Sequence, residues 1–281
     1  MILSTDSTAN LPKEYYEKYN IKMIPMQIIM DDITYDDLSD KLPTKDYYQR
    51  MREGATPTTA QINEYSAREY FEGLLETGED VLHICFSSAL SGTCATIKRV
   101  ANELNSTHTN KVVVIDSLNA SCGEGVLVLL AHDLISQGKS IDEVKTEIEK
   151  LVPNICSYFT VEQLKYLVRG GRLGKFSGIV GTLLNIKPVL RVDENGKLVS
   201  YKKVISRKKS VAEICNIAAQ KIADKRYCLI AHAECVDEAE EMAKTLNETL
   251  GVTPVITDLT QVIGCHTGPG LLALFFVGKE R

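Results

Sequence analysis

The segment SSALSGT, at residues 87–93, places three serines, a glycine and a threonine directly after an apolar run. At the start of a helix, Ser91, Gly92 and Thr93 would offer a hydroxyl group and free backbone N–H groups. The helix dipole favours an anion there, and a glycine lets the anion approach the backbone closely. A serine in this position can equally do no more than cap the helix. The segment therefore predicts an anion site or a helix cap, and it raises the question of a serine nucleophile.

His266 is the histidine best placed to serve as a base for such a nucleophile. It lies in the segment GCHTGPG, at residues 264–270, where the glycines and the proline predict a tight, rigid loop. Ser91, however, lacks the first glycine of the G-x-S-x-G turn that usually surrounds a serine nucleophile. Ser91 and His266 are therefore candidates either for a nucleophile and its base or for groups that only bind. His83, in the middle of an apolar run, is expected to be a core residue.

A second glycine-rich segment, RGGRLGK at residues 169–175, is basic. It does not match the phosphate-binding loop of nucleotide-binding proteins, because three residues instead of four separate Gly170 from Gly174 and a phenylalanine follows the lysine. A nucleotide site is therefore disfavoured. Arg169 and Arg172, beside glycine amides, are candidates for contact with a phosphate or a partner protein, and an exposed turn is the simpler alternative.

Metal sites find little support in the sequence. The eight cysteines are scattered and form no CxxC motif, which favours reduced, buried thiols over a zinc site or a disulfide framework. The acidic run at residues 31–37 could hold a divalent cation, but most such runs are simply exposed. We expect neither a metal nor a cofactor.

The elements that must position these residues follow an alternating pattern. Residues 81–86 and 112–115 are short apolar runs, typical of parallel strands covered on both faces, and a helical segment follows each. The pattern predicts an α/β domain with a mainly parallel sheet at residues 1–153. A hairpin mixed with helices predicts a second, α+β domain at residues 154–281. Ligands of such sheets bind where strands end and helices begin, which is where the polar clusters fall.

Composition and charge exclude several classes of protein. The net charge of −5 argues against a nucleic-acid partner, because binding to phosphates requires a basic surface. No apolar stretch reaches the length of a membrane span, and the first residues do not match a signal peptide. These observations predict a cytoplasmic globular protein with no integral membrane segment.

Six motifs, in this order along the chain, resemble those of the DegV family. They are TDSTANLP (residues 5–12), LSGT (90–93), DS (116–117), RGGR (169–172), IKP (186–188) and HTGPG (266–270). The resemblance extends over essentially the whole chain. It implies a two-domain α/β fold that binds a long-chain fatty acid between the domains. It also implies a role as the fatty-acid-binding subunit of a bacterial fatty acid kinase, whose catalytic subunit phosphorylates the bound acid to an acyl phosphate for phospholipid synthesis.

The same resemblance implies which residues bind the ligand. Thr59, Ser91 and His266 would hold the fatty-acid carboxylate, with the Gly92 amide assisting. Two hydroxyls, an amide and an imidazole can stabilise a carboxylate away from solvent, so the chemistry agrees with the resemblance. Arg169 or Arg172 would contribute to kinase docking or to phosphate handling.

The chain departs from the family pattern around Thr59. Ala60 and Ile62 stand where the family usually has serine and proline, and Thr59 is expected to lie where a helix opens. An acyl chain also needs an apolar cavity, for which residues 176–184 and 271–276 are candidate walls.

Two other classes of function stay open at this point. A hydrolase or acyltransferase would use Ser91 as the nucleophile and His266 as the base. A relative of the dihydroxyacetone kinases would bind a small ketone through a histidine, although the absence of a nucleotide motif and of a metal cluster in the sequence counts against it. A lipid carrier without catalytic activity of its own accounts best for the whole pattern.

Overall fold

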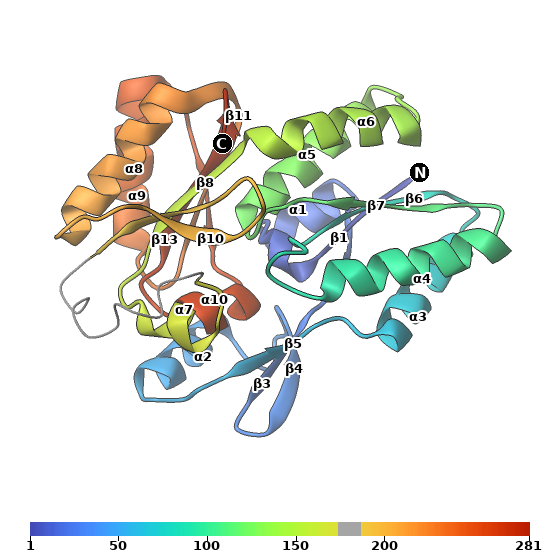
Figure 1. The fold of residues 1–281 in the computed structure, drawn as a ribbon, viewed down its shortest axis with the longest axis horizontal. Helices are drawn as coiled ribbons and strands as arrows, with labels where there is room; N and C mark the ends of the chain where they lie inside the picture. Colours follow the sequence, from blue (N-terminus) through green and yellow to red (C-terminus); the bar gives the residue numbers. More distant parts are fainter. Residues whose placement is uncertain (174–186) are drawn as a thin grey trace.

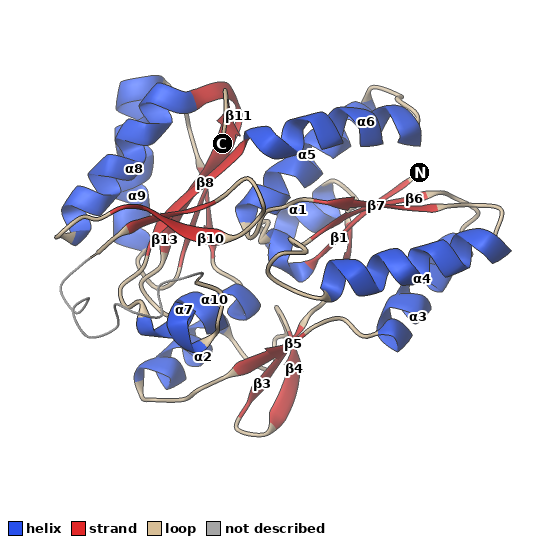
Figure 2. Cartoon of the chain, in the orientation of Figure 1, coloured by secondary structure: helices blue, strands red, loops and turns tan. Residues whose placement is uncertain are grey.

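The structure, a computed structural model, describes residues 1–173 and 187–281, and its strands form three sheets (Figure 1). A four-stranded sheet and a six-stranded sheet lie side by side, and a small three-stranded sheet lies apart from both. Helices flank the two larger sheets (Figure 2). The predicted α/β class with a mainly parallel N-terminal sheet is confirmed.

The first sheet is parallel throughout, as the apolar runs predicted. Its strand order is β2 (Lys22–Ile24), β1 (Ile2–Asp6), β6 (Val81–Cys85) and β7 (Val112–Asp116). Every residue of β6 is buried, His83 included, which confirms the expectation of a core histidine. Side chains of a strand alternate between the two faces of a sheet, so full burial of β6 means that both faces are covered.

Helix α5 (Cys122–Ser136) contacts both large sheets. It packs against β1 and β6 of the first sheet and against β8, β11 and β13 of the second (Figure 1). Because α5 is enclosed on every side, its residues 122–131 are all buried. A helix in such a position is expected to be mostly apolar all round. The helices α3 (Glu64–Leu75), α4 (Thr93–Thr107) and α6 (Ile141–Leu151) also precede residue 153.

The second sheet is mixed. Its order is β10 (Leu198–Lys202), β9 (Val189–Val192), β8 (Ile155–Thr160), β13 (Leu272–Gly278), β11 (Ile222–His232) and β12 (Val255–Asp258). The helices α8 (Arg207–Lys221) and α9 (Val236–Leu250) contact this sheet over a separate apolar cluster. The larger core contains residues from both sides of residue 153, and the domain boundary placed there stays a prediction.

The small sheet contains two elements that the sequence did not predict. Its antiparallel strands are β4 (Ile33–Asp36), β3 (Gln27–Met30) and β5 (Thr58–Ala60), and β4 lies within the acidic run. Thr59 therefore lies in a strand, and the expectation that it opens a helix is wrong. Helix α3 begins after Asn63, whose side chain accepts the Ser66 N–H.

His266 also lies in an unexpected element. The segment expected to be a loop forms helix α10 (Gln261–Thr267), which ends at Gly268 with a positive φ of 77°. Helix α10 contacts β3, β5, α2 (Thr44–Arg52) and α7 (Lys165–Arg169). The glycines thus terminate a short helix instead of shaping a loop around the histidine.

Two further observations bear on the sequence predictions. All eight cysteines are free, and seven of them are buried. No helix among the described residues has both the length and the apolar character needed to cross a membrane. The remaining helices are α1 (Lys13–Lys18) and the 3-10 turns at Ser7–Ala9 and Val152–Asn154.

Candidate functional site

The residues singled out from three distant segments line one pocket, which we call the polar pocket. Thr59 comes from β5, Ser91 and Gly92 precede α4, and His266 comes from α10. The cavity volume of the pocket is about 240 Å³. Its lining residues are Met26, Thr59, Gln61, Phe86, Leu90, Ser91, Gly92, Arg172, Val262, Ile263 and His266.

Thr59 and His266 form the central hydrogen bond of the polar pocket. Thr59 Oγ1 lies 2.9 Å from His266 Nε2. Burial, and then the nearby Arg172 and Arg169, lower the pKa of His266 to about 4, so the imidazole is neutral near pH 7. When Nε2 carries the single ring proton, it donates to Thr59 and leaves the threonine hydroxyl free to donate to an anion.

The other ring nitrogen of His266 faces the backbone. His266 Nδ1 is buried and has no hydrogen-bond partner among residues 1–173 and 187–281. A Cβ atom at Gly170 would collide with this nitrogen. The glycine of the basic segment is therefore needed for the close approach of the imidazole.

Ser91 directly precedes Gly92, the N-cap residue of helix α4, and lines the polar pocket. Its Oγ donates to Thr93 Oγ1 (3.0 Å) and accepts the Thr93 N–H (3.2 Å). The Gly92 N–H donates to no other residue in the described part of the chain, and Gly92 is exposed. A hydroxyl and an unused N–H at the start of a fifteen-residue helix form the arrangement expected for an anion.

The arrangement does not match a serine nucleophile and its base. His266 Nε2 binds Thr59, and no hydrogen bond joins His266 to Ser91 among the described residues. Within the part of the chain that the structure describes, His266 Nδ1 also lacks the carboxylate that orients the base in such triads. Ser91 and His266 share a pocket without forming a nucleophile–base pair.

The structure separates the two arginines of the basic segment. Arg172 is half-buried, and its guanidinium donates to Leu90 O (3.3 Å) and Gly170 O (2.6 Å). Arg169 is exposed and lies over the ring of Tyr166, 5.3 Å from its centre. Arg172 therefore belongs to the pocket, whereas Arg169 belongs to the surface.

A second, almost entirely apolar cavity adjoins the polar pocket, and we call it the apolar chamber. Its cavity volume is about 60 Å³, below the range usual for small-molecule sites, so the surrounding side chains would have to separate to admit an acyl chain. Its walls include Phe159 of β8, Val192 of β9, and Ala273 and Phe275 of β13. The two cavities share Phe86, Leu90, Arg172, Ile263 and His266.

Of the two segments predicted to line this cavity, the structure describes one. Leu271, Ala273 and Phe275 line the apolar chamber, so residues 271–276 supply part of its wall as predicted. The other predicted wall, residues 176–184, lies outside the described residues, as do Gly174, Lys175 and Ile186 of the quoted motifs.

Sequence reasoning missed Asp37, which anchors the helix that carries His266. Asp37 is buried, and its Oδ1 accepts the backbone N–H groups of Gln261 (3.0 Å) and Val262 (3.3 Å) at the start of α10. Burial outweighs these hydrogen bonds and raises the pKa of Asp37 to about 7. The acidic run containing Asp37 pointed only to a surface cation site, because nothing in it marks one carboxylate as buried.

Comparisons with known proteins agree on one family. A family model described as "Uncharacterised protein, DegV family" matches residues 2–279. A DegV domain-containing protein of Clostridium perfringens is 36% identical over 285 residues, which cover 100% of this chain and 98% of that protein.

Solved structures share the fold over the same length. A DegV family protein from Thermus thermophilus, described as fatty-acid binding, is 30% identical with a TM-score of 0.89, and the match covers 99% of each chain. A fatty-acid-binding DegV family protein from Streptococcus agalactiae is 28% identical with a TM-score of 0.89, over 100% of this chain and 99% of that one. Together with the family model, these similarities show that this chain belongs to the DegV family.

Proposed function

We propose that this protein binds a long-chain fatty acid, with the carboxylate in the polar pocket and the acyl chain in the apolar chamber. The observation that carries the proposal is the junction of the two cavities, which share Phe86, Leu90, Arg172, Ile263 and His266. A ligand with an anionic head and an apolar tail matches this change in lining. Relatives described as fatty-acid-binding proteins support the assignment.

In the polar pocket the carboxylate would accept hydrogen bonds from several donors. The Thr59 hydroxyl and the Gly92 N–H line the pocket with the neutral imidazole of His266, and the Ser91 hydroxyl would turn from Thr93 Oγ1 to donate to the ligand. Hydrogen bonds to a charged group contribute about 1.5–3 kcal/mol each, and Arg172 adds a positive charge at the junction of the cavities. No attack by Ser91 is needed for binding.

The apolar chamber would supply most of the affinity for the chain. Burial of each methylene contributes about 0.8 kcal/mol. Phe159 and Phe275, on neighbouring strands, give part of the wall along which an acyl chain would lie. The protein needs no metal or cofactor for this role.

We further propose that the bound acid is the substrate of a partner fatty acid kinase, and that this cytoplasmic protein carries the resulting acyl phosphate toward phospholipid synthesis. The exposed side chain of Arg169, three residues before the half-buried Arg172, would be accessible to the kinase. The acyl phosphate would remain in the polar pocket until it is transferred.

Native mass spectrometry of the purified protein tests the binding role. The expected result is a protein that carries one long-chain fatty acid, which is identified after extraction. An empty protein whose esterase activity disappears in a Ser91→Ala variant would instead establish the hydrolase alternative.

A second assay tests the kinase role separately. The loaded protein is incubated with ATP and a bacterial fatty acid kinase catalytic subunit, and hydroxylamine traps any acyl phosphate as a hydroxamate. We expect a hydroxamate only when both proteins are present. A loaded protein that yields none would contradict the kinase role and leave the binding role intact.

A further inference from the structure

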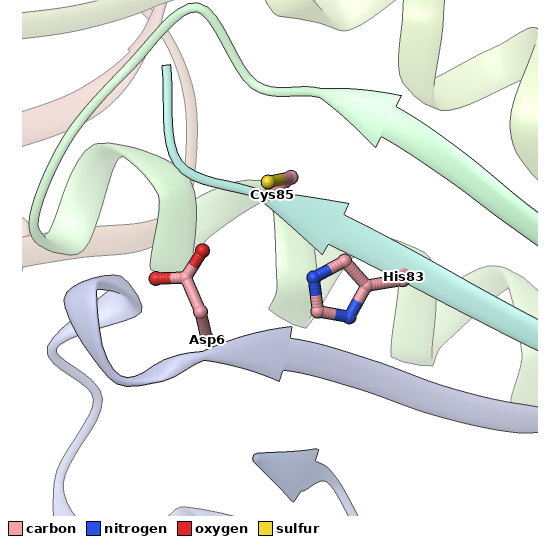
Figure 3. Close-up of side chains that lie close together, drawn as sticks. All are labelled: Asp6, His83 and Cys85. Carbon is pink, nitrogen blue, oxygen red and sulfur yellow. The ribbon is translucent and has the colours of Figure 1, made fainter. Parts of the chain in front are cut away.

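Three possible metal ligands lie together in the first sheet, away from the polar pocket. Asp6 ends β1, and His83 and Cys85 lie on the neighbouring strand β6 (Figure 3). The register pairs Ser4 with His83, so Asp6 lies beside Cys85, and residues two apart on a strand share one face. One donor atom from each residue lies within 4.8 Å of the other two.

His83 is prepared to donate a lone pair into this cluster. Its Nδ1 is 2.9 Å from Ser4 Oγ, which is 2.8 Å from the Tyr70 hydroxyl. The other nitrogen, Nε2, has no partner among the described residues although the side chain is completely buried. In Figure 3 this nitrogen points toward Asp6 and Cys85. Metal-binding histidines are typically held in this way by a hydrogen bond to the opposite nitrogen.

The local charge favours a cation. Asp6 and Glu124 are both completely buried, and the Thr8 hydroxyl contacts both carboxyl groups. Within residues 1–173 and 187–281 neither carboxyl forms an ion pair with a lysine or an arginine. Burial raises the pKa of both carboxyl groups, so a cation bound at Asp6 would take the place of the proton that otherwise neutralises it.

We propose that Asp6, His83 and Cys85 bind a zinc ion. Burial raises the pKa of Glu124 well above its usual value, so this neighbour stays uncharged. A divalent ion with one carboxylate, one thiolate and one neutral imidazole then gives a net charge of zero, whereas a monovalent ion would leave a buried negative charge. Thiolate and imidazole ligands select zinc over calcium or magnesium. Three protein ligands are the number found in zinc sites that keep one position open.

The spacing of the donors fits this ion. Ligand atoms around tetrahedral zinc are separated by about 3.5 Å, so donors within 4.8 Å of one another converge after side-chain adjustments of about 1 Å. The site departs from the expectation of no metal, which depended on CxxC motifs and acidic runs.

Zinc at this position would reinforce the wall between the sheet and the two cavities. The Phe86 N–H donates to Asp6 Oδ2 (2.9 Å), and the Phe86 side chain lines both the polar pocket and the apolar chamber. The cluster itself lines neither cavity. Zinc binding therefore does not require a bound fatty acid, and either proposal can fail without the other.

Calorimetric titration of the chelator-treated full chain with ZnCl2 tests the proposal. We expect one zinc per chain with a dissociation constant below about 1 μM. Loss of a ligand in Cys85→Ser or His83→Gln should abolish this binding. Ser4→Ala keeps all three ligands but removes the bond to His83 Nδ1, and should weaken zinc binding about 10–100-fold. Cys228→Ser, which removes a buried thiol from the other sheet, should leave it unchanged.

If the ligand variants fail to fold, binding of Co²⁺ to the wild-type protein tests the metal site instead. Bound Co²⁺ should give a thiolate-to-metal charge-transfer band in the wild type and in Cys228→Ser. The proposal is wrong if the wild type shows neither tight zinc binding nor this band. It is also wrong if folded Cys85→Ser or His83→Gln binds zinc as tightly as the wild type.

Discussion

His266 is half-buried and His83 is completely buried, and each has one ring nitrogen without a hydrogen-bond partner in the described part of the chain, but different parts of the fold hold them. His266 bonds Thr59, which lies 207 residues away on another element, and its ring rests against Gly170. His83 bonds Ser4 on the neighbouring strand of the same sheet. The geometry of the polar pocket therefore depends on the packing of separate elements against one another, whereas the geometry of the cluster around His83 depends only on the register of one sheet. Changes far from the ligand should therefore disturb His266 and spare His83.

The largest expected effect is the change in stability with pH that results from the ionisation of Asp37. The folded-state pKa of about 7 lies above the ordinary value of 3.8, so Asp37 contributes stability that is fully present below about pH 3.8. This contribution is lost as pH rises through about 7, and the loss is on the order of 4 kcal/mol. Asp37→Asn stays neutral and can still accept the Gln261 N–H. Its free energy of unfolding, measured with urea between pH 4 and pH 8, should fall less steeply than that of the wild type.

Asp36→Asn is the matched control, because Asp36 is an exposed neighbour in β4. Its urea-unfolding curves should follow the wild type at each pH. Parallel pH profiles for Asp37→Asn and the wild type would show that Asp37 does not anchor α10 as an uncharged group.

The next largest effect should come from Gly170→Ala. The new Cβ would push the imidazole of His266 away and break its bond to Thr59. We expect fatty-acid binding, measured by calorimetry, to weaken by about 3 kcal/mol, or roughly 150-fold. Gly73→Ala, on α3 with open space around it, should leave binding unchanged. If folded Gly170→Ala binds the fatty acid with wild-type affinity, Gly170 is not needed for the binding site.

The same difference between the two regions explains how much the sequence could predict. Strand β6 was identified because burial on both faces requires a continuous apolar run; the run predicted at residues 81–86 ends one residue earlier in the structure, at Cys85. Helix α10 was missed because its seven residues end in glycines, which resemble a loop. Strand β5 was missed because three residues carry no periodicity, and only pairing with β3 makes Thr58–Ala60 a strand.

The sequence singled out residues that line the polar pocket, but it did not reveal the residues that support them. Ser91 and Gly92 carry a local signal, since hydroxyls and a glycine before a helix have few uses. Asp37 has no such signal, because its importance comes from burial against a helix more than 220 residues away. The Asp6–His83–Cys85 cluster escaped notice for a related reason, since register between strands, and not spacing within one, brings its members together.

Single hydroxyl deletions in the polar pocket should have a smaller effect than Gly170→Ala. Thr59→Val removes the partner of His266, and Ser91→Ala removes the group that faces the pocket beside Gly92. Each should weaken fatty-acid binding by about 1–3 kcal/mol, or roughly 5–150-fold, because a hydrogen bond to a buried charge is lost. Calorimetry with a saturated fatty acid measures the effect. Ser88→Ala, an exposed hydroxyl in the same segment, serves as the control. Unchanged affinity in both pocket variants would place the head group elsewhere.

The smallest effect on binding should come from Arg169→Ala. Arg169 is exposed and contacts the ring of Tyr166, and exposed substitutions of this kind usually change free energies by less than about 0.5 kcal/mol. Lys165→Ala is its control, since that side chain lies over the same ring. If Arg169 contacts the kinase, Arg169→Ala should lower the yield of trapped acyl phosphate while fatty-acid affinity stays unchanged. Equal yields for Arg169→Ala and Lys165→Ala would contradict a role in docking. A fall in the fatty-acid affinity of Arg169→Ala would instead mean that the binding site extends to the surface and includes Arg169 as well as Arg172.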